Sequence, residues 1–205
     1  GFDRYFQIVR CFRDEDLRLD RQPEFTQIDV EMSFVEQNDV FDVIEGLVAR
    51  LWKELLGIEV PRPFPRMPFD ESMARYGNDK PDLRFGMEHV VLTDLVRQQG
   101  GGGVPLLQEA VAQGGIVKAL KVPASAGLSR TEVDKLEEYV RGMGAKGLAR
   151  AKVGDGGEWT QSPFAKTITA EMRQAMNAAA GAQPGDLLLF QFGKPSTVHT
   201  VMANL

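Results

Sequence analysis

The sequence predicts an α+β protein with two parts. Two strand-like stretches joined by a long polar loop occupy residues 1–34, and a helix-like stretch follows them directly. After residue 86, strand-like and helix-like stretches alternate, which favours an α/β arrangement. We therefore expect part of an antiparallel sheet with a packed helix in residues 1–86, and a compact α/β domain in residues 87–205.

The first two strands are expected to pair antiparallel across a polar loop at residues 13–24. Residues 4–12 are rich in β-forming side chains, and residues 25–34 alternate between two faces. The apolar face of the second strand holds Ile28, Val30, Met32 and Phe34. Its polar face holds Gln27, Asp29, Glu31 and Ser33.

An amphipathic helix should begin at a cap on Asn38 and end at Gly57. Its buried stripe is expected to hold Val40, Ile44, Leu47, Leu51 and Leu55. Residues 61–68 contain four prolines and must be extended. A short helix at residues 70–76 should end at Gly77.

The second part begins with a glycine run, Gly100–Gly103, which predicts a flexible turn or loop. Strands are then expected at residues 116–122, 147–153 and 186–192. Helices are expected at residues 129–141, 166–180 and 196–205, the first with Ser129 and Glu132 spaced as a capping box.

Composition narrows the class of protein. Hydrophobic residues make up 43% and charged residues 26%, which are values of a globular chain. The net charge of −5 means that any contact with nucleic acid must be local. Cys11 is the only cysteine, which excludes an intrachain disulfide and a cysteine-based zinc site. We expect a cytoplasmic protein without a membrane partner, because neither a signal peptide nor a long apolar run is present.

The hairpin carries the residues that suit an anionic substrate. Arg13 lies at the exit of the first strand, where a guanidinium can neutralise a phosphate. Phe25 opens the return strand on the side of Gln27, Asp29 and Glu31, so a base could stack on it while the carboxylates bind an amino group or magnesium. A solvated loop and a solvent-facing strand explain the same pattern, and both interpretations stay open.

Longer stretches resemble a known family. Residues 1–34, with Phe12-Arg-Asp-Glu-Asp-Leu-Arg18 and Asp20-Arg-Gln-Pro-Glu-Phe-Thr-Gln-Ile-Asp29, resemble motif 2 of class II aminoacyl-tRNA synthetases in its aspartyl form. Arg75-Tyr-Gly-Asn-Asp-Lys-Pro-Asp-Leu-Arg84 is similar to a second aspartyl signature. From residue 87 the chain resembles the domain inserted in bacterial aspartyl-tRNA synthetases and shared with a subunit of the tRNA-dependent amidotransferase. That likeness lies in residues 144–148, 162–166 and 184–187.

The resemblance implies a fold and an activity. Residues 1–86 would be a partial class II catalytic domain, and residues 87–205 a C-terminally truncated insertion domain. The activity would be the ATP-dependent attachment of L-aspartate to tRNA(Asp) through an aspartyl-adenylate, with Mg2+, in a full-length homodimer. Motifs 1 and 3 of the family are expected outside these residues, so the chain alone is expected to be inactive.

The resemblance also implies roles for the nucleotide-binding residues. Arg13 would contact the ATP α-phosphate and the aspartate carboxylate, and would be the catalytic residue. Glu15 would hold the adenine amino group, Gln22 would make a further ATP contact, and Phe25 would stack on adenine.

Further roles concern the other two substrates. Asp29 and Glu31 would face the ammonium of bound aspartate, and Arg18 and Arg21 would meet the acceptor end of the tRNA. No residue is expected as a metal ligand, because magnesium would bridge phosphate oxygens.

Other functions stay open at this point. The chain could be a non-catalytic module that binds tRNA or protein, a relative that activates an amino acid without charging tRNA, or a synthetase that charges both the aspartate and the asparagine tRNA. His89 and His199 lie far apart in sequence and are expected to be surface or packing residues. Lys146 and Lys166 are expected to be structural, with a tRNA or partner contact as the alternative.

Overall fold

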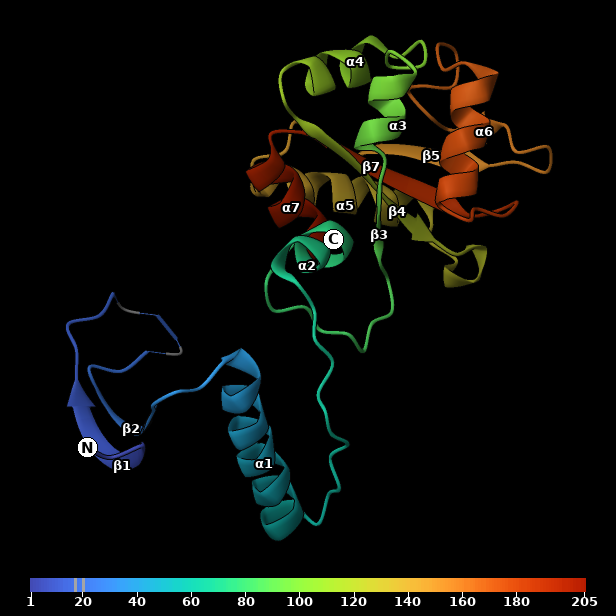
Figure 1. The fold of residues 1–205 in the computed structure, drawn as a ribbon. Helices are drawn as coiled ribbons and strands as arrows, with labels where there is room; N and C mark the ends of the chain where they lie inside the picture. The colour runs from blue at the N-terminus through green and yellow to red at the C-terminus, as the bar shows by residue number, and fades with distance from the viewer. Residues whose placement is uncertain (17, 20) are drawn as a thin grey trace. The chain divides into compact units, whose positions relative to one another are not determined.

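A computed structural model describes residues 1–16, 18–19 and 21–205, so Leu17 and Asp20 of the expected loop lie outside the described residues. The chain forms two compact units, Gly1–Arg66 and Met67–Leu205 (Figure 1). None of the described helices is long and apolar enough to span a membrane.

The first unit contains the expected hairpin. β1 (Arg4–Phe12) pairs antiparallel with β2 (Glu24–Met32), with Arg4 opposite Met32 and Phe12 opposite Glu24. The second strand ends two residues before its predicted end, because Phe34 has a positive φ of 56° that breaks the extended backbone. The two strands of the predicted hairpin are thus confirmed.

α1 (Gln37–Leu56) follows the hairpin and ends at Gly57 as predicted, in the left-handed conformation with φ 69°. The predicted cap on Asn38 is wrong. Glu36 is the N-cap, and its backbone N–H donates to Asp39 Oδ2 at 2.8 Å, because the capping box places an acidic residue three positions after the cap.

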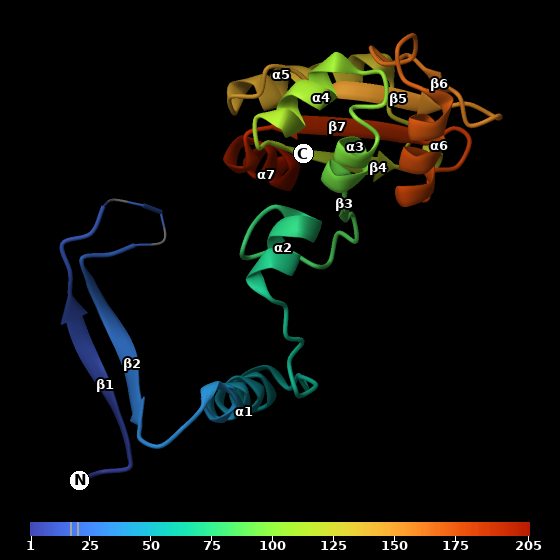
Figure 2. The ribbon, with the colours of Figure 1, turned by 45° about the horizontal axis from the view of Figure 1, so that its top comes forward.

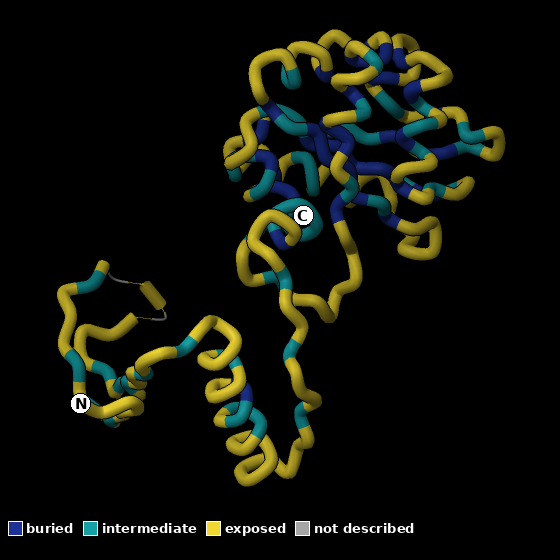
Figure 3. Tube along the Cα trace, in the orientation of Figure 1, coloured by how far each residue is buried: buried dark blue, intermediate teal, exposed yellow. Residues whose placement is uncertain are grey.

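The apolar stripe of α1 is exposed, which contradicts the expectation that it is buried. Val40, Ile44, Leu47 and Leu51 are 37–41% exposed, because no described residue of this unit covers them. Glu45 is instead the only buried residue described in this unit. Figure 3 shows that the described part of the unit is otherwise exposed or intermediate. The unit therefore has no apolar core of its own within its described residues.

The proline-rich segment after α1 is held to the helix by two arginines. Arg66 forms an ion pair with Glu45, and its guanidinium lies 4.3 Å from the centroid of the Phe41 ring. Arg62 Nη2 donates to the backbone oxygen of Asp42 at 2.9 Å. These contacts fix an extended segment that has no strand partner among the described residues.

The second unit is built on a five-stranded sheet in the order β3-β4-β7-β5-β6 (Figure 2). Its strands are β3 (His89–Val91), β4 (Ile116–Val122), β5 (Ala149–Val153), β6 (Trp159–Thr160) and β7 (Leu187–Gly193). Strands and helices alternate along the chain as predicted, yet every pair of neighbouring strands is antiparallel. This mixture of helices with antiparallel sheets confirms the α+β class.

Helices flank this sheet. They are α2 (Phe69–Tyr76), α3 (Thr93–Gln98), α4 (Pro105–Ala112), α5 (Arg130–Gly142), α6 (Ala170–Ala179) and α7 (Pro195–Asn204), with a 3-10 turn at Ala124–Ala126. α6 begins four residues later than predicted, because Thr169 caps it by accepting from the N–H of Met172. The predictions missed β3, β6, α3 and α4, which are two to eight residues long.

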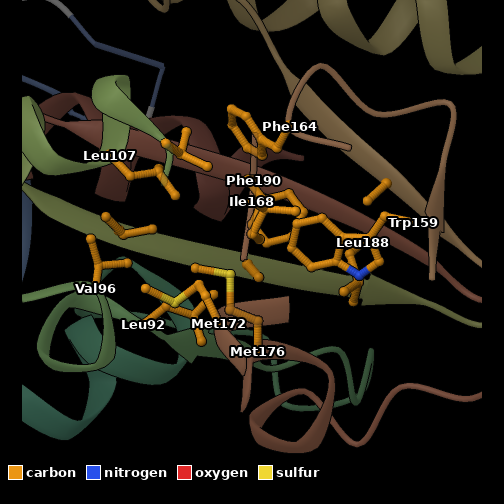
Figure 4. Packing of buried hydrophobic residues seen from close by; sticks show 14 of the residues in the cluster. Leu92, Val96, Leu107, Trp159, Phe164, Ile168, Met172, Met176, Leu188 and Phe190 are labelled. Atoms are coloured by element: carbon orange, nitrogen blue, oxygen red, sulfur yellow. The ribbon is translucent and has the colours of Figure 1, made fainter. Parts of the chain in front are cut away.

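Two apolar clusters hold the unit together. One lies between the sheet and the helices α3, α4 and α6, and Figure 4 shows its large side chains in contact. The ring of Phe190 lies 5.2 Å from that of Trp159 and 6.1 Å from that of Phe164, measured between centroids. The second cluster joins the other face of the sheet to α5 and α7 through Val133, Val140 and Val198.

The glycine run is a packed turn, so the prediction of a flexible loop is wrong. All four glycines have a positive φ, and Gly101 and Gly102 are buried. A Cβ on Gly102 would lie 2.5 Å from the side chain of Met172, and one on Gly103 would lie 2.3 Å from the oxygen of Thr167. Glycine is required here because the backbone passes directly against α6 and the residues before it.

Residues 67–86 associate with the second unit, since α2 packs against β3 and α7. The division by contacts therefore falls between Arg66 and Met67. The boundary predicted at residues 86–87 is the point from which the sequence resembles the inserted domain, and it stays a prediction.

Candidate active site

The register of the hairpin decides which side chains share a face. Gln7 lies opposite Asp29, Val9 opposite Gln27 and Cys11 opposite Phe25, and opposed residues of an antiparallel pair point the same way. All six are partly shielded from solvent. The other face holds exposed apolar side chains such as Ile8 and Ile28, each more than half exposed.

Arg13 lies where β1 ends and turns onto the polar face. Its backbone N–H donates to the oxygen of Pro23 at 2.9 Å, which extends the ladder by one step. Its Nη2 donates to Gln27 Oε1 at 3.4 Å, and its Cζ lies 5.3 Å from the centroid of the Phe25 ring. The guanidinium and the aromatic ring thus lie side by side.

Asp29 lies further along the same face. Gln7 Nε2 donates to Asp29 Oδ2 at 3.1 Å, which orients the carboxylate from the neighbouring strand. Glu31 is opposite Tyr5 and exposed, and it shares the face by strand alternation. An arginine, an aromatic ring and two carboxylates therefore occupy one surface of one hairpin.

The loop residues are arranged differently from the face residues. Arg21 Nη1 donates to Glu15 Oε2 at 2.9 Å, so the residue expected at adenine and one of the residues expected at tRNA bond to each other. Arg18 and Gln22 are exposed. The roles expected for Glu15, Arg18, Arg21 and Gln22 stay predictions.

No cluster of three metal-binding side chains occurs in the part of the chain that the structure describes. Asp29 and Glu31 offer hard oxygen donors that suit magnesium, but two carboxylates cannot complete its octahedral shell. A magnesium ion at this face would keep ligands from water and from phosphate oxygens.

A buried cationic cluster in the second unit was missed by the sequence analysis. Lys118, only 1% exposed, donates to the oxygen of Met73 at 2.5 Å and lies near His89 Nδ1 at 3.5 Å and His199 Nδ1 at 3.2 Å. Burial lowers the pKa of Lys118 to about 8. Burial, with the charge of Lys118, lowers the pKa of His89 to about 4. The expectation that the histidines are packing residues holds, but they pack together.

Comparison with known proteins decides the family. Residues 1–189 match the family model described as tRNA synthetases class II (D, K and N). The chain belongs to this family. The match covers the hairpin, α1 and nearly all of the second unit, and it confirms the family predicted from the motifs of the first 34 residues.

Curated relatives of this class II chain carry the name aspartate–tRNA(Asp/Asn) ligase. The chain is 83% identical to the relative from Anaeromyxobacter dehalogenans and 53% identical to the relative from Geotalea uraniireducens. Both matches cover the full length of the chain. It is 50% identical to that of Hydrogenobaculum sp.. The chain spans about a third of the length of these relatives, 34% in the first two.

Proposed function

We propose that the protein attaches L-aspartate to tRNA in two steps, with ATP as the energy source and aspartyl-adenylate as the intermediate. One observation carries this proposal, namely that Arg13, Phe25 and Asp29 share the polar face of the β1–β2 hairpin. These groups match the three parts of the reactants: a phosphate, a base and an ammonium.

The nucleotide would lie across Arg13 and Phe25. Adenine would stack on the Phe25 ring, and the guanidinium beside it would bind the α-phosphate and the aspartate carboxylate that attacks it. Glu15 would accept from the adenine amino group and Gln22 would make a further contact. Glu15 accepts from Arg21 through Oε2, so its Oε1 would be the oxygen that accepts from the adenine amino group.

The reaction needs no side-chain nucleophile, because the carboxylate of aspartate itself attacks the α-phosphorus. Arg13 lowers the barrier by holding both oxyanions together and by stabilising the charge that develops between them. A magnesium ion bound to the ATP would neutralise phosphate charge and help pyrophosphate to leave.

Aspartate would be oriented by the second half of the face. Asp29 keeps one oxygen on Gln7 and would receive the substrate ammonium with the other, and Glu31 would add negative charge two residues further on. This arrangement supports an amino acid as the partner of ATP, because an ammonium needs carboxylates beside the phosphate-binding arginine.

The acceptor end of the tRNA would meet Arg18 and Arg21, the cations of the loop. The relatives are named for charging both tRNA(Asp) and tRNA(Asn), and we propose the same dual use here. We also propose a homodimer in the cytoplasm, where protein synthesis takes place. We propose that the 205 residues alone are inactive, since they span about a third of the length of the relatives.

The test is aspartate-dependent exchange of pyrophosphate into ATP by the full-length protein. Arg13→Ala should abolish exchange. Arg10→Ala is the matched control, because Arg10 lies on the opposite face of the same strand and pairs with Glu24 at 3.1 Å. Normal exchange by the Arg13 variant would overturn the assignment.

A further inference from the structure

A groove in the second unit has no part in the proposed adenylate chemistry. A cavity of about 1170 Å³ is lined by residues 144–150, by α4, by residues 161–164 and by the start of α7. A smaller cavity of about 360 Å³ shares Arg130, Arg150 and Gln161 with it. The shared residues place the two cavities next to each other along β5, and we refer to them together as the groove.

The groove concentrates positive charge in a chain whose net charge is −5. Its lining carries Glu109 and Glu137 as acidic residues. Glu137 is already neutralised by Arg141, whose Nη2 lies 2.7 Å away. The cations along the groove are Arg130, Lys146, Arg150, Lys152 and Lys194.

The lysines are the cations that remain available. Arg150 Nη1 lies 2.8 Å from Asp134 Oδ1, and Arg130 Nε lies 4.0 Å from Asp134 Oδ2. Among the described residues, Lys146, Lys152 and Lys194 form no ion pair, and all three are exposed. Their charges are therefore unneutralised along the groove wall.

The floor of the groove is the open part of β5. Pairing with β6 covers only Lys152 and Val153, and the N–H of Val153 donates to Asp186 on the β7 side at 2.9 Å. The N–H and C=O groups of successive strand residues point to opposite sides. Those of Arg150 therefore point to the edge of β5 that β6 leaves unpaired. Gln161, directly after β6, has a positive φ of 51°, which ends the extended backbone of that strand.

Two features decide what the groove accommodates. Cations spread along a cavity larger than a typical small-molecule pocket suit a polymer with repeated charges rather than one compact anion. The part of β5 that β6 leaves unpaired carries Arg150, and a charged residue at an open strand edge disfavours the addition of another strand, which argues against an extended peptide. A phosphodiester backbone fulfils both conditions, because it carries one charge per nucleotide and needs no strand pairing.

We propose that this groove binds the sugar–phosphate backbone of the tRNA, with Lys146 and Lys194 as its principal phosphate contacts. That the RNA is a tRNA rests on the proposed function; the phosphate recognition rests on the groove itself. Lys194 adds its charge at the N-terminus of α7, where the helix dipole also favours an anion. Such contacts position the RNA without reading its sequence.

The experiment measures binding of a tRNA(Asp) transcript to the full-length protein by fluorescence anisotropy, over a range from about 0.05 M to about 0.2 M salt. The double variant Lys146→Ala/Lys194→Ala should raise the Kd at least about 10-fold and reduce the slope of log Kd against log salt by about 1.5, since two phosphate contacts are lost. Pyrophosphate exchange, which needs no tRNA, should be unchanged.

The matched control is Lys80→Ala/Lys135→Ala, which removes two exposed lysines of the same unit that do not line the groove. It should leave the Kd and the slope unchanged. Equal Kd values for the two double variants would overturn the proposal. The proposal would also be overturned if a glutamate octapeptide competed with the tRNA as strongly as an octanucleotide RNA does. The groove would then be a site for acidic peptides. If the unmodified protein shows no aspartate-dependent pyrophosphate exchange, the proposed function is overturned. The result for tRNA binding to the groove is not affected by that outcome.

Discussion

Lys118 Nζ lies 3.2 Å from His199 Nδ1, although 81 residues separate them in the sequence. Together with His89 Nδ1 and the oxygen of Met73, this gives the ammonium three acceptors for its three donors. His89 in turn bonds through Nε2 to the oxygen of Met202 at 2.9 Å. The cluster thereby joins α2, β3, β4 and α7 around one buried cation.

The cluster should make the attachment of α2 and α7 sensitive to acid. The pKa of His89 is lowered to about 4 by burial and by Lys118, and that of His199 is lowered by the same causes. The unfolded chain therefore takes up protons near its ordinary histidine pKa of about 6.5 while the folded unit does not, so stability falls as the pH drops through that value. His89 alone should account for about 2 kcal/mol between about pH 7.5 and about pH 5.

Hydrogen–deuterium exchange of α2 and α7 in the full-length protein, corrected for the intrinsic rate, measures this loss. Exchange should rise toward pH 5, above the range in which carboxylates become protonated. His89→Gln keeps a donor for Met202 and should reduce the rise. Identical pH dependence of the two proteins would show that His89 is not the responsible group.

The packed glycine turn allows a comparison of two alanine substitutions. Gly100→Ala should cost on the order of 1 kcal/mol, since φ is 58° but nothing lies within 4 Å of a new Cβ. Gly103→Ala should cost clearly more, because a Cβ there would lie 2.3 Å from the backbone oxygen of Thr167. Thermal unfolding of the two variants checks the order. An equal loss in both would mean that the turn shifts freely, as a flexible loop would.

The hairpin and most helices could be predicted because their signals are local. Strand alternation fixed the faces of β2, and Gly57 and Gly77 marked the ends of α1 and α2. The nearness of Arg13 and Phe25 follows from the same reasoning, since antiparallel pairing brings the two ends of a hairpin loop together. Local patterns thus sufficed to predict that Arg13 and Phe25 lie side by side, while their roles stay predictions.

The remaining features depend on contacts between distant elements. In the sequence, Lys118 is a polar residue within a predicted strand. No residue near it in the sequence indicates that two histidines lie beside its amine. The open edge of β5 arises from the short β6 and from the conformation of Gln161, and no residue type signals either. The pairing of Glu15 with Arg21 likewise depends on the geometry of the loop.

Removal of the aromatic ring should separate ATP binding from aspartate binding. Phe25→Ala in the full-length protein should raise the KM for ATP about 10-fold, because stacking of a base on an aromatic ring is worth roughly 1–3 kcal/mol. The KM for aspartate should change little, since Asp29 keeps its bond to Gln7. Steady-state exchange kinetics measure both constants. A rise confined to the KM for aspartate would place the ring at the wrong substrate.

Glu45 should limit how readily a protease cleaves the proline-rich segment that follows α1. Burial favours the neutral acid, but the hydrogen bond and charge of Arg66 outweigh it, so the pKa of Glu45 is lowered and the carboxylate stays ionised. Its Oε2 has no hydrogen-bond partner among the described residues, so the arginines beside it are the compensation for its burial. Glu45→Ala should release Arg66 and speed trypsin cleavage after it in the full-length protein. Glu54→Ala is the control, because Glu54 pairs with Arg50 on the exposed side of α1 at 2.8 Å and should leave the cleavage rate unchanged. If both variants are cleaved at the rate of the unmodified protein, the segment is held by its prolines and not by the buried carboxylate.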